Sequence, residues 1–316
     1  MVKHLPPAIK HLLTLRNPAT LPAPPISKLH AVLTSTYRSA RDRNAETAWL
    51  VLTVNAIREA ARPSEGSFFI SCRQACTLTT ANRPSTMAQL YRFVKRGTTS
   101  DADSRSIGAS ATLAEAVNRA ALIREAVLKS VIFVGVPRVI LSFAAFNEAL
   151  DPDVKAALRS KSHRDATSEN IESTVERGKA LWRSIYTPHA EKLHDKLGSY
   201  HPDFIAFIIQ SYGSVLAPMP GGLKSFSDSS SVTDPDQGNL SRTLSSVVGL
   251  ACLRAEERVV PQLTSHVFGL LKARYVEGKS EEDAWLATDE GTEWVIRTVD
   301  DIVDVVKSEH EVRVKL

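Results

Sequence analysis

The chain has 316 residues, of which 43% are hydrophobic and 23% charged, an ordinary composition for a globular protein that can bury a core. The net charge is only +4, and no Lys/Arg cluster alternates with aromatic residues, so we expect no nucleic-acid partner. The longest apolar run, residues 131–146, contains Pro137 and Arg138. It is shorter than the roughly 20 residues of a membrane-spanning helix, so we expect no membrane span.

Residues 1–41 form a basic N-terminal extension, in which no acidic residue precedes Asp42. Apolar residues fall on one face of a helix at its start, and this profile is typical of a mitochondrial targeting segment. The alternative is a solvated tail followed by a stiff Pro-rich spacer at residues 18–25. The end, Val314-Lys315-Leu316, resembles the Ser-Lys-Leu peroxisomal signal except at its first position. We therefore expect a mitochondrial location, with the peroxisome as the alternative.

Helical periodicity dominates the chain, and strand-like alternation is nearly absent, so the predicted class is all-α. In the first half we predict helices over residues 26–37, 46–60, 87–96 and 112–129. Residues 62–85 interrupt the pattern with Pro63, Gly66 and two cysteines, Cys72 and Cys76. This segment is predicted to be an irregular insertion.

Residues 124–150 are predicted to form a helical hairpin. Two apolar segments meet there at Gly135-Val136-Pro137. The small residues Gly135, Ala144 and Ala145 are expected where the two helices approach each other closely.

In the second half, helices are predicted after Pro152 and over residues 168–186, 190–197, 202–212, 244–255, 261–276 and 292–307, with a short one after Ser280. Ser168 and Ser280 are the expected helix caps, and Pro202 suits a first helical position. Residues 221–243 are rich in Ser, Asp and Gly and are predicted to be a flexible loop.

These helices resemble the carboxymuconolactone decarboxylase/alkylhydroperoxidase D (AhpD-like) superfamily. There, a helix with a Glu precedes Cys-x-x-Cys-x-x-x-His, and a helical hairpin packs behind. Residues 46–56 are similar to the Glu-bearing helix and place Glu46 at the family's Glu position. Residues 262–273 are similar to the His-bearing helix and place His266 at the family's His position.

The resemblance implies two related, degenerate modules, residues 42–220 and 244–316, joined by the loop. In the first module the cysteine positions fall on Arg58 and Ala61, and in the second on Val259 and Gln262. The redox pair is therefore absent. Cys252 lies in an apolar helix and is predicted to be a core residue.

Two functions remain open on these residues. The first is a binding or assembly factor in an organelle, with a protein partner, self-association or a small ligand. The second is an enzyme that uses His266, with Glu46 at its family position, for proton transfer on a small carbonyl, lactone or hydroperoxide. The structural alternative for His266 is a hydrogen-bonded side chain between two helices. No phosphate loop, metal motif or cofactor motif occurs, so we expect neither a metal nor a cofactor.

Overall fold

The computed structural model describes residues 7–9, 11, 24–55, 84–96, 111–256 and 258–307. The predicted insertion at 62–85, with Cys72 and Cys76, lies almost entirely outside these residues, as do the family positions Arg58 and Ala61. Within them no strand occurs, and the predicted all-α class is confirmed. The helices are α2 (Ile26–Arg41), α3 (Glu46–Asn55), α4 (Pro84–Arg96), α5 (Leu113–Val134), α6 (Val136–Ala149), α7 (Pro152–Ala157), α8 (Ile171–Tyr186), α9 (Ala190–Tyr200), α10 (Pro202–Ser211), the π-helix η1 (Tyr212–Leu216), α11 (Arg242–Glu256), α12 (Val260–Leu271), the 3-10 helix η2 (Lys272–Tyr275), α13 (Glu281–Leu286) and α14 (Asp289–Lys307).

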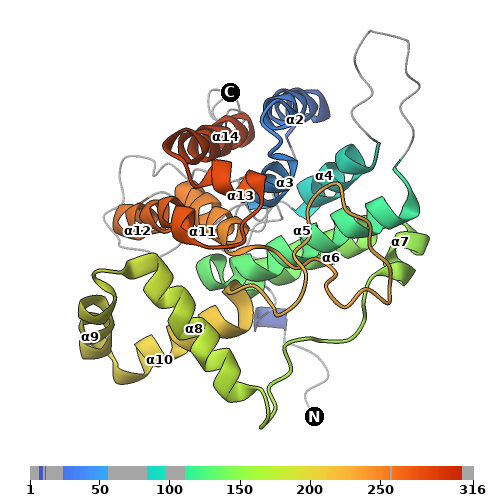
Figure 1. Ribbon diagram of the computed structural model, residues 1–316. Helices are drawn as coiled ribbons and strands as arrows, with labels where there is room; N and C mark the ends of the chain where they lie inside the picture. Colours follow the sequence, from blue (N-terminus) through green and yellow to red (C-terminus); the bar gives the residue numbers. More distant parts are fainter. Residues whose placement is uncertain are drawn as a thin grey trace.

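The helix α5 crosses the middle of the molecule, and its ends follow from local sequence (Figure 1). Thr112 and Glu115 form a capping box, in which each side chain accepts a hydrogen bond from the other residue's backbone N–H. The helix ends at Gly135, whose φ of 83° is a conformation that favours glycine. α6 begins directly afterwards, with Pro137 in its first turn. The predicted break between two apolar helices is confirmed.

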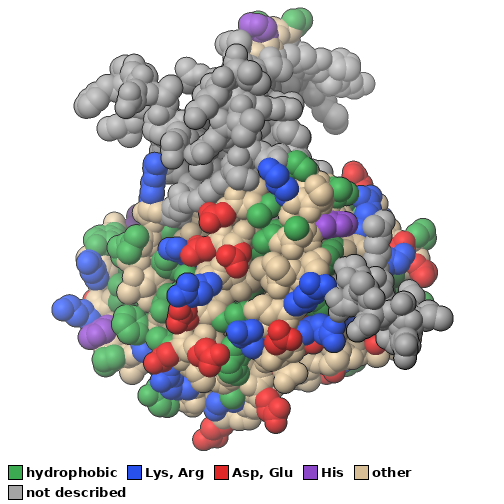
Figure 2. Space-filling model, turned by 90° about the horizontal axis from the view of Figure 1, so that it is seen from above, with side chains coloured by type: hydrophobic (Ala, Val, Ile, Leu, Met, Phe, Trp, Pro, Cys, Tyr) green, Lys and Arg blue, Asp and Glu red, His purple; other side chains and the backbone are tan. Residues whose placement is uncertain are grey.

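The helices form a main body and a small lobe (Figure 1). In the main body, one core contains buried residues of α2, α3, α4, α5, α6, α11 and α14. The small lobe, which we define as α8, α9, α10 and η1, has its own core around Trp182, Ile185 and Tyr212. On the face in Figure 2, basic and acidic side chains are mixed across the described surface. No described helix is long and apolar enough to cross a membrane.

The predicted domain boundary at residue 41 does not separate an extension from the body. α2 belongs to the main core, because Leu29 and Leu33 are fully buried in it. The same helix packs against α14 at the other end of the chain, where Trp294 Nε1 donates a hydrogen bond to Ser39 Oγ at 3.0 Å. Any free N-terminal extension must therefore end before α2. Most of residues 1–25 lie outside the described part of the chain.

The segment 221–243 is irregular, as predicted, but it is packed rather than free. Asn118 of α5 donates a hydrogen bond to Ser225 O at 2.7 Å, and Phe226 N donates one to Thr47 Oγ1 at 2.9 Å. Gln237 is buried. The composition predicted a flexible loop, and its flexibility stays a prediction. A Ser- and Asp-rich composition shows that a segment is not helical but does not show which partners hold it.

Two other details differ from the sequence predictions. Ala144 is exposed on α6 and does not lie in a close helix contact. Ser168 does not cap α8. That helix begins at Ile171 after Asn170, whose side chain holds the preceding turn by accepting from Thr167 N and donating to Asp165 O. Ser280 does cap α13, by accepting from Asp283 N.

The two segments predicted to be matching hairpins differ in their helices. Residues 112–150 contain α5 and α6, joined by a single glycine. Residues 261–306 contain most of α12, then η2, α13 and α14. An internal duplication stays a prediction from the sequence resemblance.

Candidate functional site

His266, the predicted proton shuttle, is buried in α12, with 4% of the residue exposed. Its ring packs edge-on against Phe133 of α5, at 5.2 Å between centroids, and against Tyr186 of α8, at 6.4 Å. Gly249 of α11 makes room for it, because a Cβ atom there would lie 2.8 Å from His266 Nδ1. His266 therefore fills a packed contact between helices.

The surroundings of His266 keep its imidazole neutral. Burial lowers its pKa to about 4, and the nearby Arg242 guanidinium acts in the same direction. Neither a hydrogen bond nor a carboxylate of the described residues contributes to this shift. The hydroxyl group of Tyr186, one of the two rings packed against His266, is paired with the Tyr212 hydroxyl at 3.1 Å. A relay of protons needs a partner within hydrogen-bond reach, and His266 has none among these groups.

Glu46, the second predicted site residue, lies in the first turn of α3, where a negative charge suits the helix N-terminus. Its charge raises the pKa of Tyr37 in α2 and that of Glu282 in α13. These neighbours differ from those of His266, and no hydrogen bond or ion pair of the described chain joins the two residues. The structure does not bring the predicted site residues together.

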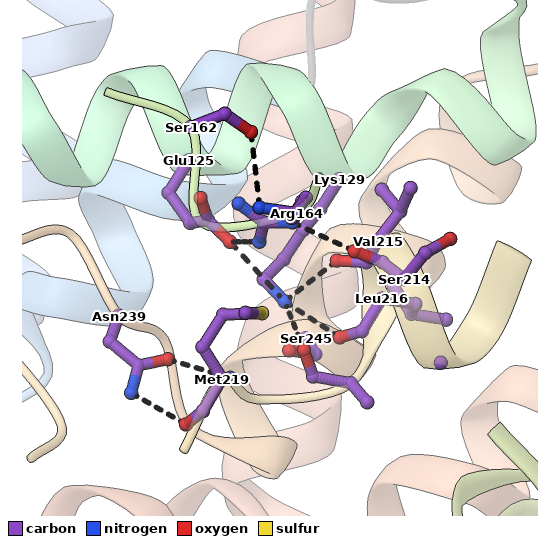
Figure 3. A network of polar contacts seen from close by, with 12 residues as sticks. Glu125, Lys129, Ser162, Arg164, Ser214, Val215, Leu216, Met219, Asn239 and Ser245 are labelled. Carbon is purple, nitrogen blue, oxygen red and sulfur yellow. Dashed lines mark hydrogen bonds and ion pairs between the residues drawn. The ribbon is translucent and has the colours of Figure 1, made fainter. Parts of the chain in front are cut away.

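A buried polar network links α5 to the small lobe instead (Figure 3). Lys129 is fully buried, and its Nζ donates hydrogen bonds to the backbone oxygens of residues 215–217 at 3.0, 2.7 and 3.0 Å. One turn earlier, Glu125 lies 3.5 Å from Nζ and forms an ion pair with Arg164. Arg164 also donates from Nε to Ser214 O at 2.8 Å.

The network satisfies a buried ammonium group mainly with carbonyl groups. Three N–H donors meet three acceptors at the end of η1, where free helix carbonyls carry partial negative charge. Burial lowers the pKa of Lys129 to about 8, and the Glu125 carboxylate opposes that shift. Lys129 is thus charged at neutral pH and enclosed, so it fixes η1 against α5 and is not placed to attack a substrate.

A cavity of about 480 Å³ lies beside this network, between α5, α6 and α7. Its volume falls within the range of sites for small molecules. One part of the wall is apolar, and it consists of Leu128, Phe143, Phe146, Leu150 and Leu158. The other part is polar, and it includes Arg124, Glu125, Asn147, Lys155, Arg159, Ser160 and Gln237.

Of the three cations in this wall, Arg124 and Arg159 are held by neutral groups. Both terminal nitrogens of Arg124 donate to Arg159 O, at 3.3 and 3.4 Å, and Arg159 Nη1 donates to Lys161 O at 2.9 Å. Lys155 is exposed. The carboxylate in the wall, Glu125, is already bound by Arg164 and Lys129. No ion pair of the described residues neutralises Arg124, Lys155 or Arg159, so the cavity carries unpaired positive charge.

Two of these cations, Arg124 and Arg159, are partly buried and near each other, and the Glu125 carboxylate offsets part of their charge. Burial lowers the pKa of Arg124, and the charge of Arg159 lowers it further. Burial also lowers the pKa of Arg159. Gln237, from the segment 221–243, positions this residue by accepting a hydrogen bond from Arg159 N at 2.8 Å. An anionic ligand would relieve the repulsion within the cluster.

Sequence patterns alone do not mark Arg124, Lys129 or Arg159 as site residues. One signal was available for Lys129. It stands four residues after Glu125 in a helix whose neighbouring positions are apolar, which marks a buried charged pair. No comparable signal existed for Arg159, because its position depends on Gln237, 78 residues later in the chain.

The described part of the chain contains neither a cysteine pair nor a group of side chains that could hold a metal ion. Cys252 is buried in α11, as predicted. No group of three or more His, Cys, Asp or Glu residues in the described ranges lies close enough together to hold a metal ion.

Comparison with known proteins adds no relative: no family model, curated protein or solved structure matches this chain.

Proposed function

We propose that this protein binds a small organic anion in the cavity between α5, α6 and α7. The observation that carries the proposal is the set of three unpaired cations, Arg124, Lys155 and Arg159, beside an apolar wall. Guanidinium groups pair with carboxylate or phosphate groups through parallel hydrogen bonds. The aromatic and aliphatic wall suits a hydrocarbon or aromatic part of the same ligand.

Binding is better supported than proton transfer at His266. Catalysis on a carbonyl, lactone or hydroperoxide would need an acid–base group that a substrate can reach. His266 is buried among rings and lines none of the cavities described here. Glu46 has other neighbours. We therefore favour the binding function over the enzyme.

The test is a calorimetric titration with phenylacetate and with phenylacetamide, its neutral isostere. We expect phenylacetate to bind and the amide to bind much more weakly. The double variant Lys155→Gln/Arg159→Gln should weaken phenylacetate binding by roughly tenfold to a hundredfold, since a hydrogen bond to a charged group is worth about 1.5–3 kcal/mol.

The matched control is Arg183→Gln, which removes a positive charge from an exposed position on α8. It should leave the affinity unchanged. Equal binding of the acid and the amide, or an unchanged affinity in the double variant, would contradict the proposal. Turnover of a lactone that His266→Gln abolishes, with phenylacetate binding intact, would favour the enzyme instead.

The superfamily membership is also part of this proposal: we infer a divergent AhpD-like protein without the redox pair. The all-α class of the structure agrees with this inference but does not distinguish this superfamily from other helical proteins.

We also propose that the protein binds a protein partner or a second copy of itself. The support is that α6 exposes two apolar residues, Val136 and Ile140, at 59% each. Light scattering at several concentrations tests self-association.

We propose a mitochondrial location on the basic, acid-free start of the sequence, with the peroxisome as the alternative. A fluorescent tag at the C-terminus blocks a peroxisomal signal and spares a mitochondrial one. Mitochondrial fluorescence is the expected result. A diffuse signal that becomes punctate when the tag is moved to the N-terminus would contradict it.

A further inference from the structure

A second cavity, of about 350 Å³, opens between the small lobe and α12. Its apolar wall comes from Ile185, Tyr186, Leu193 and Phe268. Phe268 is 56% exposed, so its ring is available to the hydrocarbon part of a ligand. The remaining lining residues are His189, Lys192, Lys196, Ser265 and Lys272. This lining contains no Asp or Glu.

The lysines on α9 face the cavity without partners. Lys192 and Lys196 are four residues apart, which places them on the same face of the helix. The acidic residues between and beside them are engaged elsewhere: Glu191 lies 3.9 Å from Arg183, and Asp195 contacts His194. Among the described residues, no ion pair neutralises either lysine.

More positive charge lies beneath the cavity. Lys272 donates from Nζ to Ile185 O at 2.7 Å, at the C-terminal end of α8. Behind it, the buried guanidinium of Arg242 donates hydrogen bonds to Ser184, Ser246 and Gly269 O, all of which are neutral, and no carboxylate of the described residues pairs with it. Arg242 is near enough to lower the pKa of Lys272. A buried cation without a carboxylate adds to the positive potential at this site.

We propose that this cavity binds an amphiphilic anion, independently of the site between α5 and α7. Its carboxylate or phosphate group would lie between Lys192, Lys196 and Lys272. Its hydrocarbon part would cover Phe268 and Leu193. A free acyl anion and a lipid headgroup share this chemistry. The bounded volume favours the free anion, and the two sources are separated below.

The experiment uses the full chain and an eight-carbon fatty acid that carries an aliphatic diazirine. After irradiation, labelled peptides are identified by mass spectrometry. We expect labelling in α9 and α12, and competition by octanoate but not by octanamide. Lys192→Gln/Lys196→Gln should reduce this labelling about tenfold, because two charge contacts are lost. Both positions are exposed, so the variant should fold normally.

The variant Lys155→Gln/Arg159→Gln is the matched control, because it removes the same charge from the first cavity. It should leave labelling of α9 and α12 intact, so the two proposals fail or succeed separately. Labelling that is unchanged in Lys192→Gln/Lys196→Gln, or equal competition by octanamide, would overturn this proposal. Binding to anionic phospholipid vesicles without labelling by the free acid would also overturn it, in favour of a membrane-surface contact.

Discussion

The contact between Gly249 and His266 depends on a single absent methyl group. The imidazole of α12 lies against the backbone of α11, and Phe133 closes the same space from α5. A Cβ atom at position 249 would lie 2.8 Å from His266 Nδ1 and 2.9 Å from Phe133 Cζ. Both rings are held by further neighbours, so neither can move away freely.

We therefore expect Gly249→Ala to destabilise the protein by about 1–3 kcal/mol, as overpacked cores do. This would reverse the usual gain of roughly 1 kcal/mol when alanine replaces glycine within a helix. Denaturant unfolding measures the change. The control is Gly198→Ala in α9, where the nearest atom would lie 3.8 Å away. It should be neutral or stabilising. A gain of stability at both positions would show that the packing around His266 gives way.

At the scale of single residues, the sequence predicted the helix that contains His266 but not the surroundings of its side chain. Helical periodicity placed His266 in a helix, and the structure confirms it. Its burial depends on Phe133, Tyr186 and Gly249, which come from three other helices. No local pattern contains that information. The structural alternative for His266 was a hydrogen-bonded side chain; among the described residues its ring contacts are with the aromatic rings of Phe133 and Tyr186.

At the scale of the helices, the main body contacts the small lobe through one recurring type of hydrogen bond, from a cationic side chain to a backbone oxygen. Lys129 of α5, Arg242 of α11 and Lys272 of η2 each donate to backbone oxygens in the lobe. The acceptors lie at the ends of η1 and α8, where helix carbonyls lack helical donors. Cations of the body thus bind the negative ends of two lobe helices.

Removal of the buried Lys129 ammonium tests whether it holds the small lobe against the main body. Lys129→Met keeps the apolar stem of the side chain but leaves the carbonyls of residues 215–217 without their donor. We expect a loss of about 3 kcal/mol, the scale for breaking a buried charged contact. Hydrogen exchange should accelerate in residues 171–217 more than in α11. The control is Lys179→Met, whose pair with Glu176 is exposed. Uniform acceleration across both regions would argue against a separate lobe.

Helix positions were largely predictable, but helix contacts were not. The predicted ranges for α2, α5, α9 and α11 agree with the structure to within a few residues at most ends. A very close helix approach, however, lies at Gly178 and Gly213, where an added Cβ would overlap a backbone oxygen of the facing helix. These glycines are 35 residues apart in the sequence numbering. The spacing of small residues in the α5–α6 hairpin gave no indication of this contact.

In the whole molecule, two buried groups give opposite dependences of stability on pH. Burial raises the pKa of Glu282 from 4.5 to about 7, so its contribution to stability is lost as pH rises through that window. Burial lowers the pKa of His266 from 6.5 to about 4, so its contribution is lost as pH falls. Between pH 4.5 and 6.5 the two effects oppose each other.

Single variants should separate the two opposite dependences of the unfolding free energy on pH. In Glu282→Gln, the free energy of unfolding should rise by about 2 kcal/mol from pH 4.5 to 6.5, because His266 then acts with less opposition. In His266→Gln it should fall over the same range, with Asp283, whose pKa burial also raises, acting in the same direction as Glu282. Denaturant unfolding across this range provides the measurement. If the unfolding free energies of the two variants changed in parallel with pH, the assignment of the opposite pH effects to Glu282 and His266 would be contradicted.

The sequence predicted the class of the whole molecule, but its division into modules is not reflected in the core. Residues of α3, α5, α11 and α14 share one apolar cluster, although they were assigned to two modules. Amphipathic patterns show that each helix has a face to bury. They do not specify which helix will cover that face, and so they leave the arrangement of the core open.

The packing of α2 against α14 has a consequence for the order of events on the ribosome. The apolar side chains of α2, among them Leu29 and Leu33, are made long before those of α14 in the same cluster, such as Val295 and Val299. While the chain grows, this part of the core stays open to chaperones. The chain must bring these two segments together before this core can close, and contacts between such distant segments form slowly. The synthesis of α14, rather than the emergence of any earlier segment, therefore sets the earliest moment at which this core can close.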